Sequence, residues 1–289
     1  MDQDTVFPHL DSLRTGPRLL ELDQVRIFGI LNLSPDSFFS GSRLVSQPMA
    51  IDRAGKMLEE GADILDLGAA STRPGAEEPS IQEELDRLIP AIEAIHKAYP
   101  EALISADTYR SEVARKAHGA GAVIINDVSG GNLDEEMFRT VAELGAAYVL
   151  THMRGNPKTM NELANYDSVT YDAIRELSSK VNALHELGVH DILIDPGIGF
   201  AKNAAHNFQL IRELELFRIF PLPLLMGISR KRFIWQTLNN NPEEALNGTT
   251  AMHMLCLNAG AKFLRVHDVK EARETIQLFK EYQFLISDS

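Results

Sequence analysis

The chain of 289 residues contains a single cysteine, Cys256. One cysteine excludes an intramolecular disulfide and a cysteine-based zinc site. No apolar run approaches the roughly 20 residues that a membrane span requires. The first 20 residues also lack the basic stretch followed by an apolar stretch that marks a secretory signal. These absences predict a cytoplasmic protein with no membrane partner.

Positive charge is scarce as well. The chain has 28 lysine and arginine residues against 41 aspartate and glutamate residues, which gives a formal net charge of −13. A general binder of nucleic acid or of a membrane surface needs a basic face, so no nucleic-acid partner is expected. A small anionic substrate remains open, because it requires only a local cluster of arginine and lysine.

No linker or low-complexity tract divides the chain. From residue 25 onward, short apolar runs alternate with amphipathic stretches. The runs are near-continuously apolar, as expected for strands of a parallel sheet that are buried on both faces. They are Val25–Leu31, Asp63–Leu67, Ala102–Ser105, Val123–Ile125, Ala146–Leu150, Asp191–Ile194, Leu222–Ile228 and Ala261–Val266.

The stretches between the runs have the spacing of helices that bury one face. Gly61 and Gly188 provide stop signals, and Pro242 with the following glutamates predicts a helix start. The clearest predicted helices are Ala50–Glu60, Ile81–Ala98, Asp134–Leu144, Ser168–Leu187 and Lys270–Tyr282.

Eight strands alternating with helices over about 250 residues predict an α/β fold, a single (β/α)8 TIM barrel. The barrel should span residues 25–289 and follow a loosely ordered lead-in, residues 1–24. An open doubly wound sheet is the structural alternative. The first run is not followed by Gly-x-Gly-x-x-Gly, which disfavours a dinucleotide site.

Polar residues follow every predicted strand, at the end where TIM barrels carry their active sites. Any one of them alone is more often a turn former or a helix cap, but eight in order indicate a site. Carboxylate and amide groups suit a flat heterocycle with alternating donors and acceptors, and the basic groups suit an anionic leaving group. The strand ends read Asn32, Ser71-Thr72-Arg73, Asp107, Asn126, His152, Asp195, Ser229-Arg230-Lys231 and Arg265-Val266-His267.

Seven short segments resemble the dihydropteroate synthase family, in its order and at its spacing, from about Val25 to Tyr282. They are Gly29–Phe38, Ser71–Gly75, Asp107–Tyr109, Ile125–Gly131, Asp195–Phe200, Gly227–Lys231 and Arg265–Val269. The resemblance implies condensation of 6-hydroxymethyl-7,8-dihydropterin pyrophosphate with p-aminobenzoate to 7,8-dihydropteroate and pyrophosphate. It also implies a magnesium cofactor, an SN1-like loss of pyrophosphate and binding of p-aminobenzoate after the pterin.

The resemblance also assigns residues. Catalytic roles fall to Asp107, Lys231, Arg265 and His267. The pterin would be held by Asp107, Asn126, Asp195 and Lys231, with Phe200 and Gly227 shaping its slot. The pyrophosphate would be held by Asn32 with magnesium, Arg73, Arg265 and His267. The p-aminobenzoate site would be lined by Thr72, Pro74 and Ser229. A mobile loop would carry Asp36, Ser37 and Phe38.

The chain departs from the family pattern at Ala70 and at Phe39–Arg43, which bears on loop dynamics and inhibitor response. His152 could serve the site or only the structure, and Lys202, His206 and Asn207 could lie behind the site or at the surface. Cys256 is expected to be inert core. A homodimer is expected, with the helix Lys270–Tyr282 as a candidate interface.

Two other functions stay open. A pterin-binding methyltransferase domain would share the barrel and the pterin pocket, and would act on methyl-tetrahydrofolate with a corrinoid partner. It would have no reason to keep pyrophosphate ligands, so Ser229–Lys231 and Arg265–His267 favour the synthase. A non-catalytic paralogue that binds pterins is the third reading.

Overall fold

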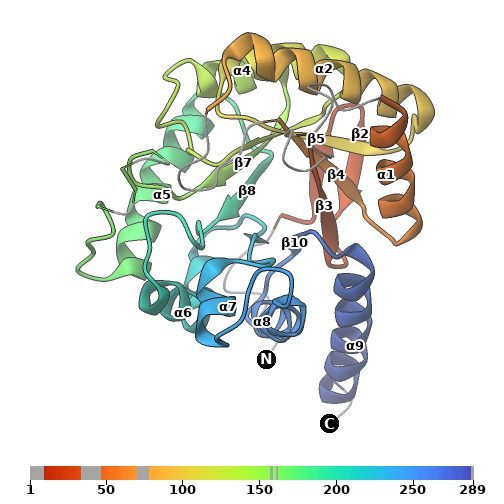
Figure 1. The fold of residues 1–289 in the computed structure, drawn as a ribbon. Helices are drawn as coiled ribbons and strands as arrows, with labels where there is room; N and C mark the ends of the chain where they lie inside the picture. The colour runs from red at the N-terminus through yellow and green to blue at the C-terminus, as the bar shows by residue number, and fades with distance from the viewer. Residues whose placement is uncertain (1–9, 34–46, 70–77, 157–158, 161, 288–289) are drawn as a thin grey trace.

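The computed structural model describes residues 10–33, 47–69, 78–156, 159–160 and 162–287, the last four of these in backbone only. The central feature is a parallel sheet of eight strands in the order β8-β7-β6-β5-β4-β3-β10-β9 (Figure 1). An isolated parallel bridge joins Ile194 to Leu224, and the Ile194 amide donates to the Pro223 carbonyl at 2.9 Å. The bridge links the two edges of the sheet, so the predicted TIM barrel is confirmed and the open sheet is excluded.

The strands coincide with the predicted apolar runs to within one to three residues. Their bounds are β3 Arg26–Asn32, β4 Ile64–Gly68, β5 Leu103–Asp107, β6 Ile124–Asp127, β7 Ala147–Thr151, β8 Ile192–Asp195, β9 Leu225–Met226 and β10 Phe263–Val266. The strand β9 is shorter than expected. Pro221 and Pro223 precede it and have no N–H for a sheet ladder.

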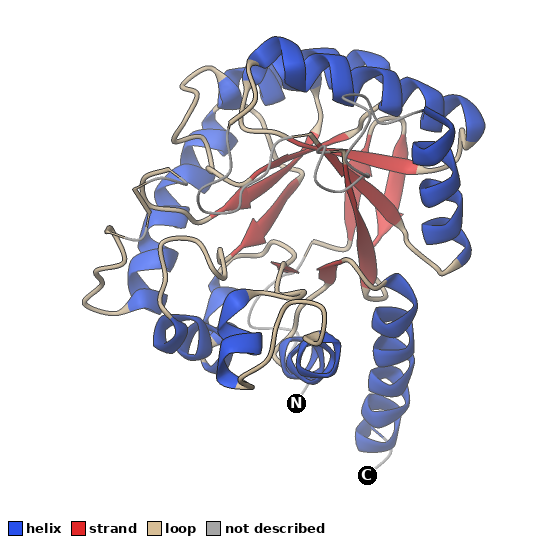
Figure 2. Ribbon diagram, viewed as in Figure 1, coloured by secondary structure: helices blue, strands red, loops and turns tan. Residues whose placement is uncertain are grey.

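Helices surround the strands on the outside of the barrel (Figure 2). Their bounds are α1 Gln47–Glu59, α2 Ile81–Ala98, α3 Ser111–Ala120, α4 Met137–Leu144, α5 Val169–Glu186, α6 Ala204–Arg212, the 3-10 helix Leu214–Ile219, α7 Arg232–Thr237, α8 Leu246–Asn258 and α9 Val269–Ser287. The helix α2 starts where the sequence predicts. The Ser80 side chain accepts from the Glu83 amide and the Glu83 carboxylate accepts from the Ser80 amide, which is a capping box.

The helix start predicted at Pro242 is wrong, because α8 begins only at Leu246. One guanidinium nitrogen of Arg230 donates to the carbonyls of Pro242 and Glu243, both at 2.8 Å. These are the carbonyls that a helix beginning at Pro242 would use for its first turn. The segment therefore forms a turn, with the Glu244 amide bonded to Asn241 Oδ1 at 3.0 Å.

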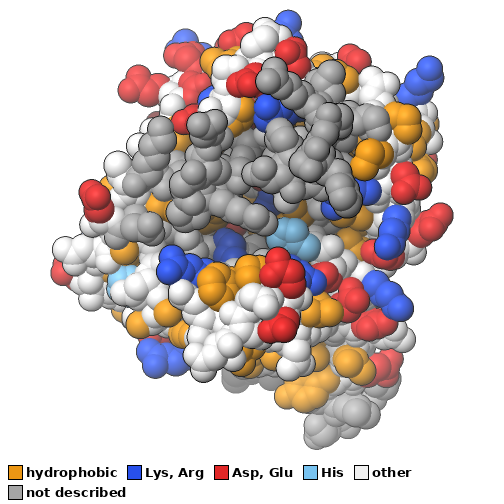
Figure 3. Space-filling model, in the orientation of Figure 1, with side chains coloured by type: hydrophobic (Ala, Val, Ile, Leu, Met, Phe, Trp, Pro, Cys, Tyr) orange, Lys and Arg blue, Asp and Glu red, His pale blue; other side chains and the backbone are white. Residues whose placement is uncertain are grey.

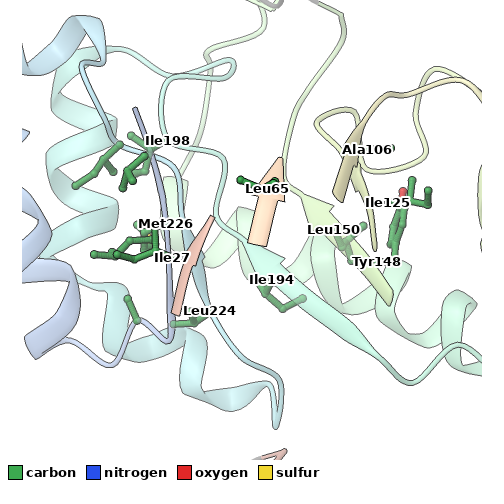
Figure 4. Packing of buried hydrophobic residues seen from close by; sticks show 14 of the residues in the cluster. Ile27, Leu65, Ala106, Ile125, Tyr148, Leu150, Ile194, Ile198, Leu224 and Met226 are labelled. Carbon is green, nitrogen blue, oxygen red and sulfur yellow. The ribbon is translucent and has the colours of Figure 1, made fainter. Parts of the chain in front are cut away.

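The core has two layers, because successive strand residues face opposite sides of the sheet. Residues such as Ile27, Leu65, Ile125, Ile194 and Met226 belong to the large cluster that includes the buried faces of the helices (Figure 4). The strand residues that face the barrel interior form a separate cluster at the amino-terminal end of the barrel, together with Leu13 and Leu22. It contains Leu13, Leu22, Phe28, Ile64, Ile124, Ala147, Val149, Leu193, Leu225 and Phe263.

Part of the lead-in is ordered structure, contrary to the sequence-based expectation. Residues β1 Ser12–Thr15 and β2 Arg18–Glu21 form an antiparallel hairpin. Leu13 and Leu22 from this region are buried in the interior cluster. The Arg14 amide donates to Asp191 Oδ1 at 2.7 Å, and Lys262 Nζ donates to the Leu22 carbonyl at 3.1 Å. The hairpin therefore closes the amino-terminal end of the barrel.

Candidate active site at the barrel mouth

The interior of the barrel changes from apolar to polar along each strand. On β4 the side chains that face the barrel interior are Ile64 and then Asp66, and on β6 they are Ile124 and then Asn126. On β10 they are Phe263 and then Arg265. Because parallel strands present their carboxyl ends at one edge, this alternation places the polar groups together at the barrel mouth.

Arg265 is the centre of the polar group. Its Nε lies 2.6 Å from Asp66 Oδ2, and its Nη2 lies 2.5 Å from Asp107 Oδ2. Asn126 Nδ2 donates to both carboxylate oxygens of Asp66, at 3.1 and 3.3 Å. Burial would lower the pKa of Arg265, but the carboxylates of Asp66 and Asp107 raise it. Burial raises the pKa of Asp107, and Arg265 opposes that change. These contacts confirm that Asp107, Asn126 and Arg265 lie together.

Asp66 was missed as a site residue. It is fully buried and holds both Arg265 and Asn126. The signal was present in the sequence, because Asp66 is the one charged residue between Ile64 and Gly68 in a strand otherwise buried on both faces. Charged residues are rarely fully buried without partners, so a charge in such a strand predicts a buried ion pair.

Lys231 is positioned by the segment that follows β8. Its Nζ donates to the Ile198 carbonyl and lies 4.4 Å from the centroid of the Phe200 ring. Burial lowers the pKa of Lys231 to about 8, although the negative charge of Asp195 opposes this shift. Gly199 has φ +82°, and a Cβ on it would lie 3.0 Å from Lys231 Cδ. Glycine therefore serves both the turn and the close passage of the lysine.

Asp195 ends β8, and Gly227 directly follows the neighbouring strand β9. Asp195 Oδ1 accepts the Gly197 amide at 2.8 Å. Burial raises the pKa of Asp195, and Lys231 opposes that change. A Cβ at Gly227 would lie 3.7 Å from Asp195 Oδ2 and 3.9 Å from Arg265 Cδ. A methyl group at Gly227 would thus be in ordinary van der Waals contact with both polar side chains, and glycine leaves that small volume between them unfilled.

Ser229 and His267 pair at the ends of β9 and β10. Ser229 Oγ lies 3.0 Å from His267 Nδ1, and it accepts the His267 amide at 3.3 Å. The structure therefore brings together two residues that the resemblance assigns to different substrates.

Asn32 ends β3, beside Gly68 of β4. Its side chain makes no hydrogen bond to any residue within the described ranges. No group of three His, Cys, Asp or Glu side chains suited to a metal occurs in that same part of the chain.

Six of the predicted site residues and both departures from the family pattern cannot be placed. Thr72, Arg73, Pro74, Asp36, Ser37 and Phe38 lie outside the described residues, as do Ala70 and the segment 39–43. Figure 3 shows lysine, arginine and histidine side chains near the centre of one face, next to the residues that are not described.

Of the residues left open, His152, Lys202 and Asn207 are buried beside the segment that follows β8, whereas His206 is partly exposed in the capping box that begins α6. The two ring nitrogens of His152 face Glu176 Oε2 and Lys202 Nζ, each at 2.9 Å, so protein groups occupy both. Asn207 Oδ1 accepts the Gly199 amide at 2.8 Å.

Cys256 is fully buried, and burial raises the pKa of its thiol to about 12, which confirms an inert core cysteine. Among the described helices, none has the length and apolarity needed to span a membrane.

Known proteins share this sequence and this fold. A family model described as "Pterin binding enzyme" matches residues 28–267. Dihydropteroate synthase of Escherichia coli K12 is 43% identical over 262 residues, covering 90% of this chain and 92% of the relative. The enzyme from Synechocystis is also 43% identical, over 247 residues that cover 84% of this chain and 85% of the relative.

Solved structures agree. Xanthomonas albilineans dihydropteroate synthase with 4-aminobenzoic acid aligns with a TM-score of 0.87 at 37% identity, covering 94% of this chain and 98% of that one. The Yersinia pestis enzyme with a sulfonamide drug complex gives 0.88 at 36% identity, covering 94% and 99%. The chain therefore belongs to the dihydropteroate synthase family of pterin-binding enzymes.

Proposed function

We propose that this chain is a transferase of folate biosynthesis. It would condense 6-hydroxymethyl-7,8-dihydropterin pyrophosphate with p-aminobenzoate and release 7,8-dihydropteroate and pyrophosphate. The observation that carries the proposal is the inward-facing group in which Arg265 joins Asp66 to Asp107 while Asn126 joins Asp66. Relatives support it, since the Xanthomonas albilineans enzyme has been solved with 4-aminobenzoic acid and with 7,8-dihydropteroate.

The pterin would bind among Asp107, Asn126, Asp195 and Lys231. Two carboxylates and one amide provide the acceptors and donors that an aminopyrimidinone edge requires. Their burial makes recognition selective, because a ligand that leaves a buried polar group unpaired loses affinity. Phe200 and Gly227 would form the walls of the slot.

The pyrophosphate would bind beside Arg265 and His267, with Arg73 as a further ligand. Asn32 fits a magnesium role, because its amide oxygen has no partner among the described residues and lies at the same edge as Arg265. Magnesium commonly combines one or two protein oxygens with substrate phosphates and water, and does not need a cage of carboxylates. When bound, the ion would offset negative charge on the phosphate oxygens.

The reaction needs no nucleophilic side chain. The bond between the pterin methylene and the pyrophosphate oxygen would break first, and the electron pair would leave with pyrophosphate. Arg265 and His267 would stabilise the leaving group, and the Asp107 carboxylate would stabilise the cationic methylene. The p-aminobenzoate nitrogen would then donate its lone pair to the methylene and lose a proton. Catalysis would rest on positioning and electrostatics.

The p-aminobenzoate site would be completed by Ser229 with Thr72 and Pro74, and Asp36, Ser37 and Phe38 would close over it after the pterin binds. Sulfonamides would compete there.

We also propose a cytoplasmic homodimer. Three large apolar side chains are exposed on α8 and α9, which pack on one another: Leu255 at 55%, Leu278 at 65% and Tyr282 at 53%.

The methyltransferase alternative makes a different prediction about binding. Calorimetry should compare a hydroxymethylpterin with its pyrophosphate ester, each with and without magnesium. A synthase should bind the pyrophosphate at least tenfold more tightly, and only with magnesium. Equal affinities would favour the methyltransferase reading, because such a domain has no use for pyrophosphate ligands.

A further inference from the structure

The segment between β8 and α6 supplies part of the pterin slot. It contributes the Ile198 carbonyl and the Phe200 ring, both of which contact Lys231. Three of its amides are hydrogen-bonded: Gly197 to Asp195 Oδ1 at 2.8 Å, Gly199 to Asn207 Oδ1 at 2.8 Å and Phe200 to the Gly197 carbonyl at 3.1 Å. We call residues 196–201 the slot loop.

Lys202 follows the slot loop directly and is buried behind it, with 8% of its surface exposed. Its Nζ donates to the Phe200 carbonyl at 2.9 Å and to the His152 carbonyl at 3.3 Å. It also lies 2.9 Å from His152 Nδ1. One amino group therefore joins the slot loop to the residue that follows β7.

The hydrogen-bond pattern fixes the tautomer of His152. The ionised Glu176 carboxylate can only accept, so the proton of the neutral ring resides on Nε2, and Nδ1 accepts a hydrogen bond from Lys202 Nζ. Nε2 then donates to Glu176 Oε2 on α5, at 2.9 Å. Burial lowers the pKa of His152 to about 4, and the positive charge of Lys202 acts in the same direction. The ring is thus a neutral relay between Lys202 and a carboxylate that Arg154 also binds.

The backbone of the slot loop is tightly packed at the same place. Gly197 has φ +73°, and a Cβ there would lie 1.9 Å from the His152 carbonyl oxygen. Ala201 adopts φ 50°, which is unusual for a residue other than glycine. The loop therefore follows a path that local preference does not select, and contacts from outside the loop must hold it there.

We propose that Lys202 is a positioning residue for the pterin slot. By binding the Phe200 and His152 carbonyls, it holds the slot loop against the end of β7, so that Ile198 and Phe200 meet Lys231 in the geometry that binds the pterin. This inference rests on the proposed function for the identity of the ligand. Burying an amino group is costly, and burial lowers the pKa of Lys202 to about 7 although Asp195 opposes this shift. The acceptors of its hydrogen bonds are the groups that shape the site.

The experiment compares Lys202→Met, Lys202→Arg and Lys262→Met. Lys262 also binds a backbone carbonyl, but at the closed end of the barrel, so Lys262→Met is a matched control. Hydrogen exchange on the peptide covering the slot loop measures loop order without any ligand. Calorimetry with hydroxymethylpterin pyrophosphate and magnesium measures the slot, and steady-state kinetics separate the KM values of the two substrates.

In the Lys202→Met variant, the Gly199 and Phe200 amide hydrogens should exchange at least tenfold faster than in the wild type. The variant should also bind the pterin at least tenfold more weakly, with a smaller change in the KM for p-aminobenzoate. Lys202→Arg retains a charged donor and should recover part of the affinity. Lys262→Met should match the wild type in both measurements. Should Lys202→Met not fold, Lys202→Gln replaces it as the uncharged variant.

Wild-type exchange and wild-type pterin affinity in the uncharged variant would overturn the inference. So would equal losses in Lys262→Met, because the effect would then reflect general stability. A wild-type protein that bound no pterin would overturn the proposed function instead, and the exchange comparison alone would then decide whether Lys202 holds the loop.

Discussion

Arg265 reaches across β3 to Asp66 on β4, with its Nε 2.6 Å from Asp66 Oδ2, although the two residues are 199 positions apart in the chain. Asp66 is fully buried, and Arg265 is 19% exposed in its side chain. Because Asp66 also holds Asn126, a single carboxylate orients two residues of the proposed pterin site.

Replacing Asp66 by asparagine should therefore lower both stability and pterin affinity. Removing one partner of a buried ion pair typically costs about 3–5 kcal/mol, and the remaining contact of Arg265 with Asp107 places the expected loss at about 3 kcal/mol. Urea unfolding measures the first effect and calorimetry the second. A variant with normal stability and normal affinity would contradict the role given to Asp66.

Substitutions at Asp107 and Lys231 test the site with less effect on folding. Asp107→Asn and Lys231→Ala should each weaken pterin binding by about 1.5–3 kcal/mol, the usual loss for a hydrogen bond to a charged group. Circular dichroism should show an intact fold in both. Unchanged affinity in both variants would remove these residues from the pterin site.

The pKa of Lys231 predicts a pH dependence. It is lowered by burial from the usual 10.5 to about 8, with Asp195, Arg265 and Asp107 as the neighbouring charges. Above pH 8 the free enzyme loses this positive charge, so kcat/KM for the pyrophosphate substrate should fall, ultimately about tenfold per pH unit. Lys231→Arg should keep its charge and flatten this alkaline limb. An unchanged limb in that variant would assign it to another group.

The same shift has a consequence for stability. Between about pH 8 and 10.5 the unfolded chain binds more protons at Lys231 than the folded chain does. The contribution of this group to the free energy of unfolding therefore rises with pH in that window. Denaturation of the wild type and of Lys231→Met across the window should differ in slope, with the steeper rise in the wild type. Parallel slopes would mean that the folded-state pKa is not lowered.

A substitution in the β1–β2 hairpin should lower the free energy of unfolding and leave pterin affinity unchanged. Leu13 is fully buried in the interior cluster at the closed end of the barrel. Leu13→Ala should lower the free energy of unfolding by about 2–5 kcal/mol, as for other buried leucines. Pterin affinity at low temperature should be retained, because the site lies at the other end. The exposed Leu19→Ala, at 63% exposure, is the matched control and should leave both quantities unchanged. A large loss of affinity in Leu13→Ala would show that the hairpin also shapes the mouth.

The strands β3 to β8 could be predicted because each is a continuous apolar run, which only a two-sided burial explains. The start of α2 could be predicted from its local sequence, since the capping box Ser80–Glu83 is complete within four residues. The hairpin could not, because strands of four residues are too short to show a period. The turn at Pro242 depends on Arg230, a residue twelve positions away.

The site residues also fall into two groups, those that the sequence predicts and those that depend on distant contacts. Asp107, Asn126, Asp195 and Lys231 follow apolar runs, so their place at the barrel mouth follows from topology. Asp66 lies within a run and was read as part of a strand. The role of Lys202 depends on the carbonyl of His152, 50 positions earlier, and sequence spacing gives no measure of that contact.

The measurement that tests the account most directly is product formation by the purified protein. Hydroxymethyldihydropterin pyrophosphate and p-aminobenzoate should yield dihydropteroate and pyrophosphate in equal amounts, with magnesium present and not in excess EDTA. Full activity in EDTA would contradict the magnesium role of Asn32. No dihydropteroate under any metal condition, from a protein that still binds the pterin pyrophosphate, would contradict the synthase function and leave a non-catalytic pterin-binding protein.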